Sequence, residues 1–138
     1  MQKEKRIGRS LFIGILILHI LGCYVMGAMI LINPKLALET GFHIHYSQEL
    51  EIISLVIGME LFFLGTMALL GVIWTRKHKL FGVYIGTAVG VYMFFFGIVA
   101  FLKLGTTDAL VVDSIRGFIT IVFGILAYRE LKQKKLNE

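Results

Sequence analysis

Four apolar runs of membrane-spanning length occupy most of this sequence. They cover residues 11–32, 52–74, 80–102 and 109–128. A helix needs about 20 apolar residues to cross the hydrocarbon core of a bilayer, and each run has that length. A spanning segment must also satisfy its own backbone hydrogen bonds, which a helix does. The sequence therefore predicts an all-α fold, a four-helix transmembrane bundle, with residues 1–138 forming one integral membrane domain.

The basic residues gather in three of the five segments outside these runs. The clusters are Lys3, Lys5, Arg6 and Arg9; Arg76, Lys77 and Lys79; and Arg129, Lys132, Lys134 and Lys135. Short loops rich in Lys and Arg stay in the cytoplasm, so both termini are predicted to be cytoplasmic. This distribution accounts for the net charge of +5 without a nucleic-acid partner. Lipid-binding or nucleic-acid-binding patches, as an added role of the clusters, are the alternative.

Three charged residues lie inside the apolar runs. Glu60 lies about 12 Å below the outer end of the second run, and Arg116 about 10 Å below that of the fourth. Asp113 precedes Arg116 by three residues, within reach on a helix. Three interpretations remain open for Glu60: a structural ion pair with Arg116, an outward-facing polar cavity shared with Arg116 and Asp113, or a protonated carboxyl.

His19 is the one histidine near the middle of a run. Haem between helices usually takes two axial ligands, so haem within one subunit is not expected. His19 is interpreted as a helix-packing side chain, and a place in a ligand cavity with Tyr92 or Tyr24 is the alternative.

The other histidines lie in loops. His43 and His45 fall on one side of an extended segment, a pattern that could bind a divalent metal or simply belong to an exposed loop. His78 lies in the basic turn and is expected to be solvated. Two histidines without a fixed third ligand are a weak metal signal, so no metal site is predicted.

Cys23 is the single cysteine, which excludes a disulfide within the chain. Basic residues followed by an apolar run and a cysteine also occur in lipoprotein signals. Here the apolar run continues to Ile32, as in an uncleaved signal-anchor helix, which is the favoured interpretation.

Glycine spacing predicts close helix packing. Gly82, Gly86 and Gly90 recur every fourth residue, a small-xxx-small face that lets a second helix approach. Gly58 and Gly65 in the second run, and Gly117 and Gly124 in the fourth, are each seven residues apart and add packing positions.

Several features recur together in the layout of the chain: Asn33-Pro34 after the first run, Gly41 in the outer loop, the acidic residues Glu49 and Glu51, and the pair Gly58 and Gly65. With these features the chain resembles the DoxX-like four-helix membrane proteins. Many members place an arginine near the start of the second helix, where this chain has Ser54. The resemblance implies a bacterial inner-membrane protein. Some members resemble subunits of quinone-linked sulfur-oxidation or oxidative-stress complexes.

No GxSxG, HExxH, Walker or dinucleotide-binding motif occurs, so an enzyme is not expected. The first hypothesis is a non-catalytic subunit or scaffold of a membrane complex without a cofactor, assembled as a homo-oligomer or with other membrane subunits. The second is a redox-associated protein that binds a quinone or small lipid in an outward-facing polar cavity. The third is a small oligomeric transporter with Glu60 as its proton or cation site.

Overall fold

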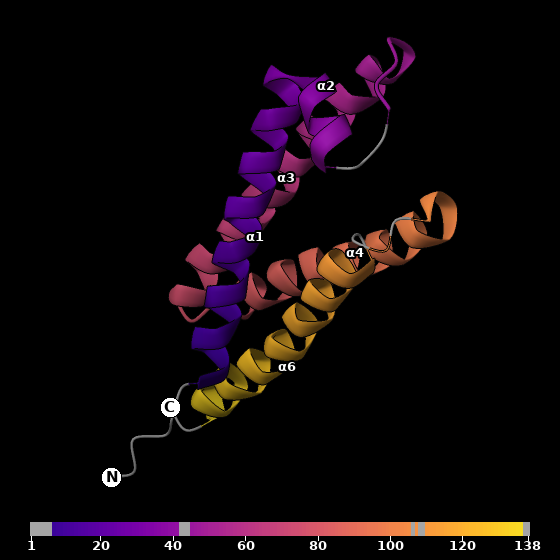
Figure 1. The fold of residues 1–138 in the computed structure, drawn as a ribbon. Helices are drawn as coiled ribbons and strands as arrows, with labels where there is room; N and C mark the ends of the chain where they lie inside the picture. Colours follow the sequence, from indigo (N-terminus) through magenta and orange to yellow (C-terminus); the bar gives the residue numbers. More distant parts are fainter. Residues whose placement is uncertain (1–6, 42–44, 106, 108–109, 137–138) are drawn as a thin grey trace. The chain divides into compact units, whose positions relative to one another are not determined.

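Long apolar helices form nearly all of the protein (Figure 1). The computed structural model describes residues 7–41, 45–105, 107 and 110–136. Its long helices are α1 (Ile7–Ile32), α3 (Glu49–Arg76), α4 (Leu80–Leu104) and α6 (Ile115–Leu136). All four are long and apolar enough to cross a membrane, which makes the chain a multi-pass membrane protein. The predicted all-α class is confirmed, whereas the side of the membrane that holds the termini stays a prediction.

The helices extend beyond the apolar runs. α1 begins at Ile7 instead of residue 11, and α6 ends at Leu136 instead of residue 128. The added residues at the end of α6 include Arg, Glu, Leu, Lys and Gln, which are good helix formers in water. A helix therefore continues past the point where its residues are apolar enough for lipid.

Two sharp turns have clear local causes. Asn33 caps the short helix α2 (Pro34–Leu36), and its side-chain oxygen accepts a hydrogen bond from the Leu36 amide at 3.0 Å. At the end of α3, the Lys79 amide donates to the Trp74 carbonyl at 2.9 Å, and the His78 amide donates to that of Thr75 at 3.1 Å. This is a Schellman motif with His78, at φ 57°, in the left-handed position that glycine usually takes.

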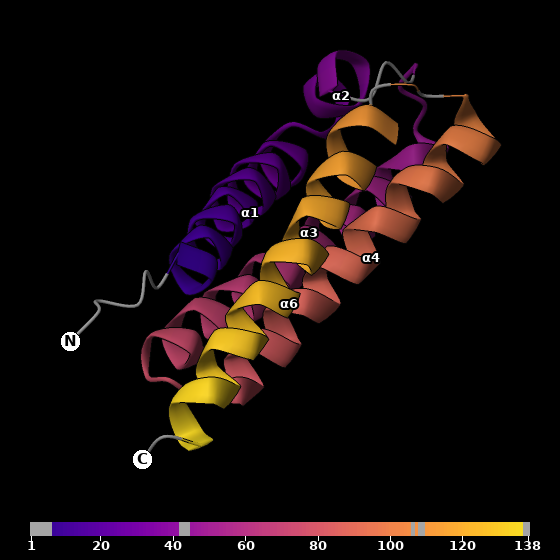
Figure 2. The same ribbon diagram turned by 90° about the horizontal axis from the view of Figure 1, so that it is seen from below.

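The chain divides into two compact units. Unit 1 contains Met1–Ile17 and Met67–Glu138, and unit 2 contains Leu18–Thr66. In unit 1, α4 and α6 run side by side (Figure 2). A π-helical turn, η2 (Leu110–Ser114), precedes α6 and also packs against α4. Unit 2 contains the later part of α1, α2, a second π-helical turn η1 (Ala37–Gly41), and the first part of α3.

Glycines on α4 bring three neighbouring segments of unit 1 close to its backbone. Gly82 faces the backbone of Gly71 and Thr75 on α3. A Cβ on Gly86 would lie 2.6 Å from the Phe12 ring of α1, and one on Gly90 would lie 2.8 Å from Thr120 of α6. In lipid, helices associate through such close van der Waals packing, because burial from water supplies no driving force there.

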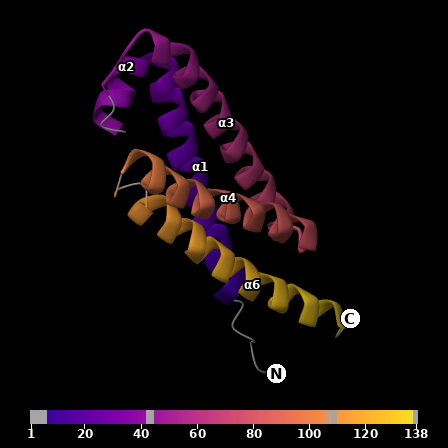
Figure 3. The ribbon, with the colours of Figure 1, turned by 90° about the vertical axis from the view of Figure 1, so that its right-hand side faces the viewer.

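In unit 2, the later part of α1 packs against the first part of α3 (Figure 3). The Tyr24 ring of α1 lies 5.3 Å from the Phe62 ring of α3, and the Tyr24 hydroxyl lies 3.1 Å from the Thr66 oxygen. Thr66 donates to the Phe62 carbonyl at 2.9 Å, so Tyr24 donates to Thr66. Gly58 and Gly65 of α3 face α1 side chains.

Candidate functional site

An ion pair lies at the start of α6. Arg116 Nη2 is 3.2 Å from Asp113 Oδ1, and the two side chains are 26% and 21% exposed. Asp113 belongs to the π-helical turn η2, and Arg116 belongs to the first turn of α6. π-helical turns are rare and often mark functional positions. Both residues fall within the candidate membrane span from Val111 to Lys134, where an unpaired charge is costly.

The Arg116 guanidinium has hydrogen-bonding capacity beyond this ion pair. An arginine side chain carries five N–H donors. Arg116 Nε is buried and has no hydrogen-bond partner among the described residues. The Arg116 carbonyl is occupied, because it accepts from Thr120 Oγ1 at 2.8 Å. Arg116 Nε is an unused donor of a kind that suits an oxygen acceptor such as a carbonyl, phosphate or carboxylate.

Glu60 lies on α3 in unit 2 and is exposed. The side chains around it on the helix are also exposed and apolar: Ile53, Val56, Met59 and Phe63. Arg116 belongs to unit 1, so the predicted pairing of Glu60 with Arg116 stays a prediction. The structure does bring Arg116 and Asp113 together.

The residues of the alternative cavity also fall in different units. His19 is fully buried in unit 2, one helical turn before the buried Cys23. Tyr92 lies on α4 in unit 1, 37% exposed, with its ring stacked on that of Phe96 at 6.1 Å. A cavity shared by His19 and Tyr92 therefore stays a prediction. Cys23 lies four residues after His19 and therefore shares the same buried face of α1. This spacing is visible in the sequence and was not used to predict the burial of Cys23.

The sequence did not reveal a polar cluster at the end of unit 1 that is predicted to face the cytoplasm. Arg9 Nη1 lies 2.7 Å from His78 Nδ1 and 3.1 Å from His78 Nε2, and the Arg9 amide donates to Glu130 Oε2 at 3.0 Å. Because the Arg9 guanidinium can only donate, a ring nitrogen of His78 accepts in this contact. His78 is thus half-buried and bonded to α1, which corrects the expectation of a merely solvated side chain.

The described residues contain no group of three or more His, Cys, Asp or Glu side chains placed to hold a metal ion. Of the two loop histidines, His43 lies outside the described residues, and His45 is exposed with Nδ1 at 4.0 Å from Glu39 Oε1.

Neither protein-family models, nor curated proteins, nor solved structures provide a match to this chain. The helices alone define the class, a multi-pass membrane protein. The resemblance to DoxX-like proteins remains an expectation from sequence.

Proposed function

We propose that this chain is a small, non-catalytic subunit or scaffold of a complex in the bacterial inner membrane, with both termini in the cytoplasm. The observation that carries the proposal is the packing of α4. Three glycines on one stripe of this helix meet three different segments of unit 1. These contacts involve backbone atoms, which cannot rotate away as side chains can, so the helices of unit 1 pack rigidly.

The other side of α4 is suited to contact with lipid or a partner helix. It exposes large apolar and aromatic side chains, among them Phe81, Tyr84, Phe95 and Val99. The charges of Asp113 and Arg116 neutralise each other within one helical turn, as expected of a structural element. The glycine stripe makes α4 rigid within unit 1, and its exposed apolar side can contact a partner helix. Together these features favour a role in assembly over a catalytic role.

Native mass spectrometry after gentle solubilisation tests the proposal. We expect masses well above the 15.6 kDa of one chain, from further copies or from other membrane proteins. Cross-linking in intact membranes provides the control for losses in detergent. Detection of only single, unassociated chains in both experiments would contradict the proposed scaffold role.

A second candidate, a protein that binds a quinone or small lipid, is favoured by the unused Nε donor of Arg116. The buried Arg116 Nε and the 26% exposure of this side chain leave donors for a carbonyl or ester oxygen. Lipid extraction and mass spectrometry of the purified protein test this candidate. A small molecule retained by the native chain, lost in Arg116→Gln and kept in Lys103→Gln, would support it, whereas equal retention in all three would exclude it.

A further inference from the structure

One end of unit 1 carries exposed cations from two segments far apart in the sequence. One segment is the α3–α4 turn and the other is the last part of α6. The exposed cations are Arg76, Lys77, Lys79, Arg129, Lys132 and Lys134.

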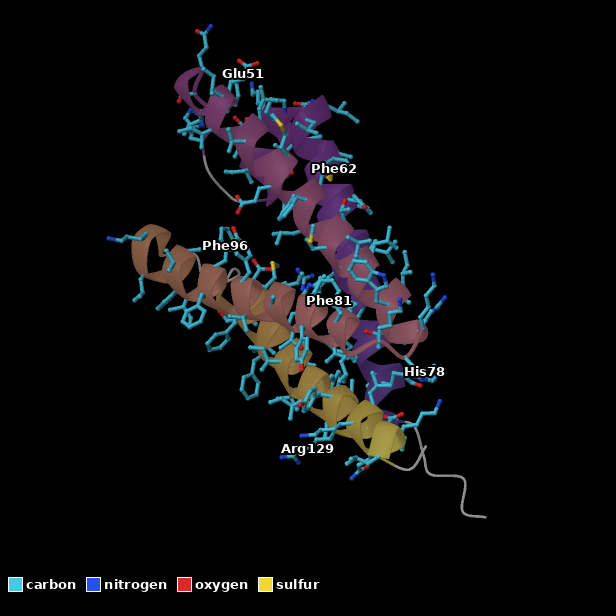
Figure 4. The ribbon with its side chains drawn as sticks, turned by 180° about the vertical axis from the view of Figure 1, so that it is seen from behind. Glu51, Phe62, His78, Phe81, Phe96 and Arg129 are labelled. Carbon is cyan, nitrogen blue, oxygen red and sulfur yellow. The ribbon has the colours of Figure 1, made fainter. Side chains whose placement is uncertain are left out.

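Contacts within unit 1 hold these two segments at the same end. The Tyr84 ring near the start of α4 lies 5.9 Å from the Tyr128 ring near the end of α6. Arg9 bonds both His78 of the turn and Glu130 of α6. Figure 4 shows His78 and Arg129 toward the same end, with Phe96 toward the other end of α4.

The described residues place little negative charge at this end, and that charge is already engaged. Among the described residues of the turn and of α6 beyond Tyr128, the one carboxylate is Glu130. It accepts a hydrogen bond from the Arg9 amide in the first turn of α1, where a carboxylate also favours the helix dipole. The exposed cations therefore form a surface with a clear excess of positive charge.

Aromatic rings lie directly beside this surface. The Trp74 and Phe81 rings are 4.9 Å apart at the α3–α4 turn, and Lys132 Nζ lies 5.8 Å from the centre of the Tyr128 ring. Trp and Tyr concentrate at the membrane–water interface. Cations immediately beyond such rings are therefore expected at the depth of the lipid phosphates.

We propose that this basic end is a binding surface for acidic phospholipids, whose headgroups carry a phosphate and no cationic group. The cations adjoin apolar spanning helices, so the polyanion nearest to them is the membrane surface itself, and a nucleic acid is disfavoured. A zwitterionic headgroup fits poorly, because its ammonium group would join a surface that is already positive. The proposal does not depend on whether the chain is a scaffold.

Competition between lipids tests it. The purified chain is exchanged into an equimolar mixture of phosphatidylglycerol and phosphatidylcholine with matched acyl chains, and bound lipids are counted by native mass spectrometry. We expect enrichment of phosphatidylglycerol, and a decrease of roughly fivefold in its affinity for each cation removed. The variants are Lys132→Gln alone and Arg76→Gln with Lys77→Gln and Lys79→Gln.

The matched control is Lys35→Gln with Lys103→Gln, which removes cations predicted to lie at the opposite membrane surface. The control should retain native lipid preference, and Lys77→Arg should retain it as well because the charge is kept. Added salt should weaken the preference, since exposed charges are screened. Equal binding of the two lipids by the native chain, or equal loss in the control, would overturn the proposal.

Discussion

At the scale of single residues, the charged side chains of Asp113 and Arg116 are limited in position by the cost of burying charge in the membrane. Asp113 and Arg116 are 3.2 Å apart and about three-quarters buried, so each removes much of the cost of holding the other in an apolar layer. Spacing along the chain predicted this contact, because side chains three residues apart share a helix face. The π-helical conformation around Asp113 was not predicted, since it depends on packing against α4.

Replacing Arg116 with Gln should destabilise the protein by about 2 kcal/mol, because Asp113 would lose the partner that offsets the cost of its burial. The double variant Asp113→Asn with Arg116→Gln should recover much of this loss. Unfolding in detergent, followed by circular dichroism, measures both. Full stability of Arg116→Gln would mean that the ion pair contributes little.

A double-mutant cycle tests the predicted ion pair between Glu60 and Arg116. We expect Glu60→Gln to destabilise the native chain and to have a smaller effect when Arg116 is already Gln, with a coupling free energy above about 0.5 kcal/mol. The same unfolding assay applies. Effects that simply add would show that Glu60 and Arg116 do not interact.

At the scale of elements, α4 organises unit 1 through its glycines. The four-residue spacing of Gly82, Gly86 and Gly90 predicted a close approach of one helix. In the structure the stripe is shared among α3, α1 and α6, because the helices cross α4 at different heights. Spacing alone defines a face, whereas the identity of the neighbour depends on how the whole unit packs.

Two alanine substitutions separate close packing from helix propensity. A Cβ on Gly117 would lie 2.5 Å from the Phe94 nitrogen and 2.6 Å from the Gly90 oxygen, which are backbone atoms that cannot yield easily. Gly117→Ala should therefore cost about 2–3 kcal/mol.

Gly14→Ala is the matched control, because a Cβ there meets nothing within 4 Å. This variant should be neutral or up to about 1 kcal/mol more stable, since alanine is the better helix former. Thermal unfolding in the same detergent compares the two. Similar costs at both sites would argue against the packing of α6 on α4.

At the scale of the whole molecule, the orientation in the membrane is a prediction from the distribution of charge. Both termini and the α3–α4 turn are expected in the cytoplasm. Single cysteines at Lys77 and at Lys103, in a Cys23→Ala background, report it directly. A membrane-impermeant maleimide on intact cells should label Lys103→Cys and leave Lys77→Cys unlabelled until the cells are lysed. The reverse pattern would invert the topology.

The sequence by itself determined the class of the protein, because membrane helices are read from length and hydrophobicity, which are local properties. It also predicted the pairing of Asp113 with Arg116, since the two residues lie within one turn of chain. Only the tertiary structure showed that Arg9 meets His78 and Glu130, which are 69 and 121 residues away. Such contacts depend on which helix ends come together, and no local pattern in the chain encodes that.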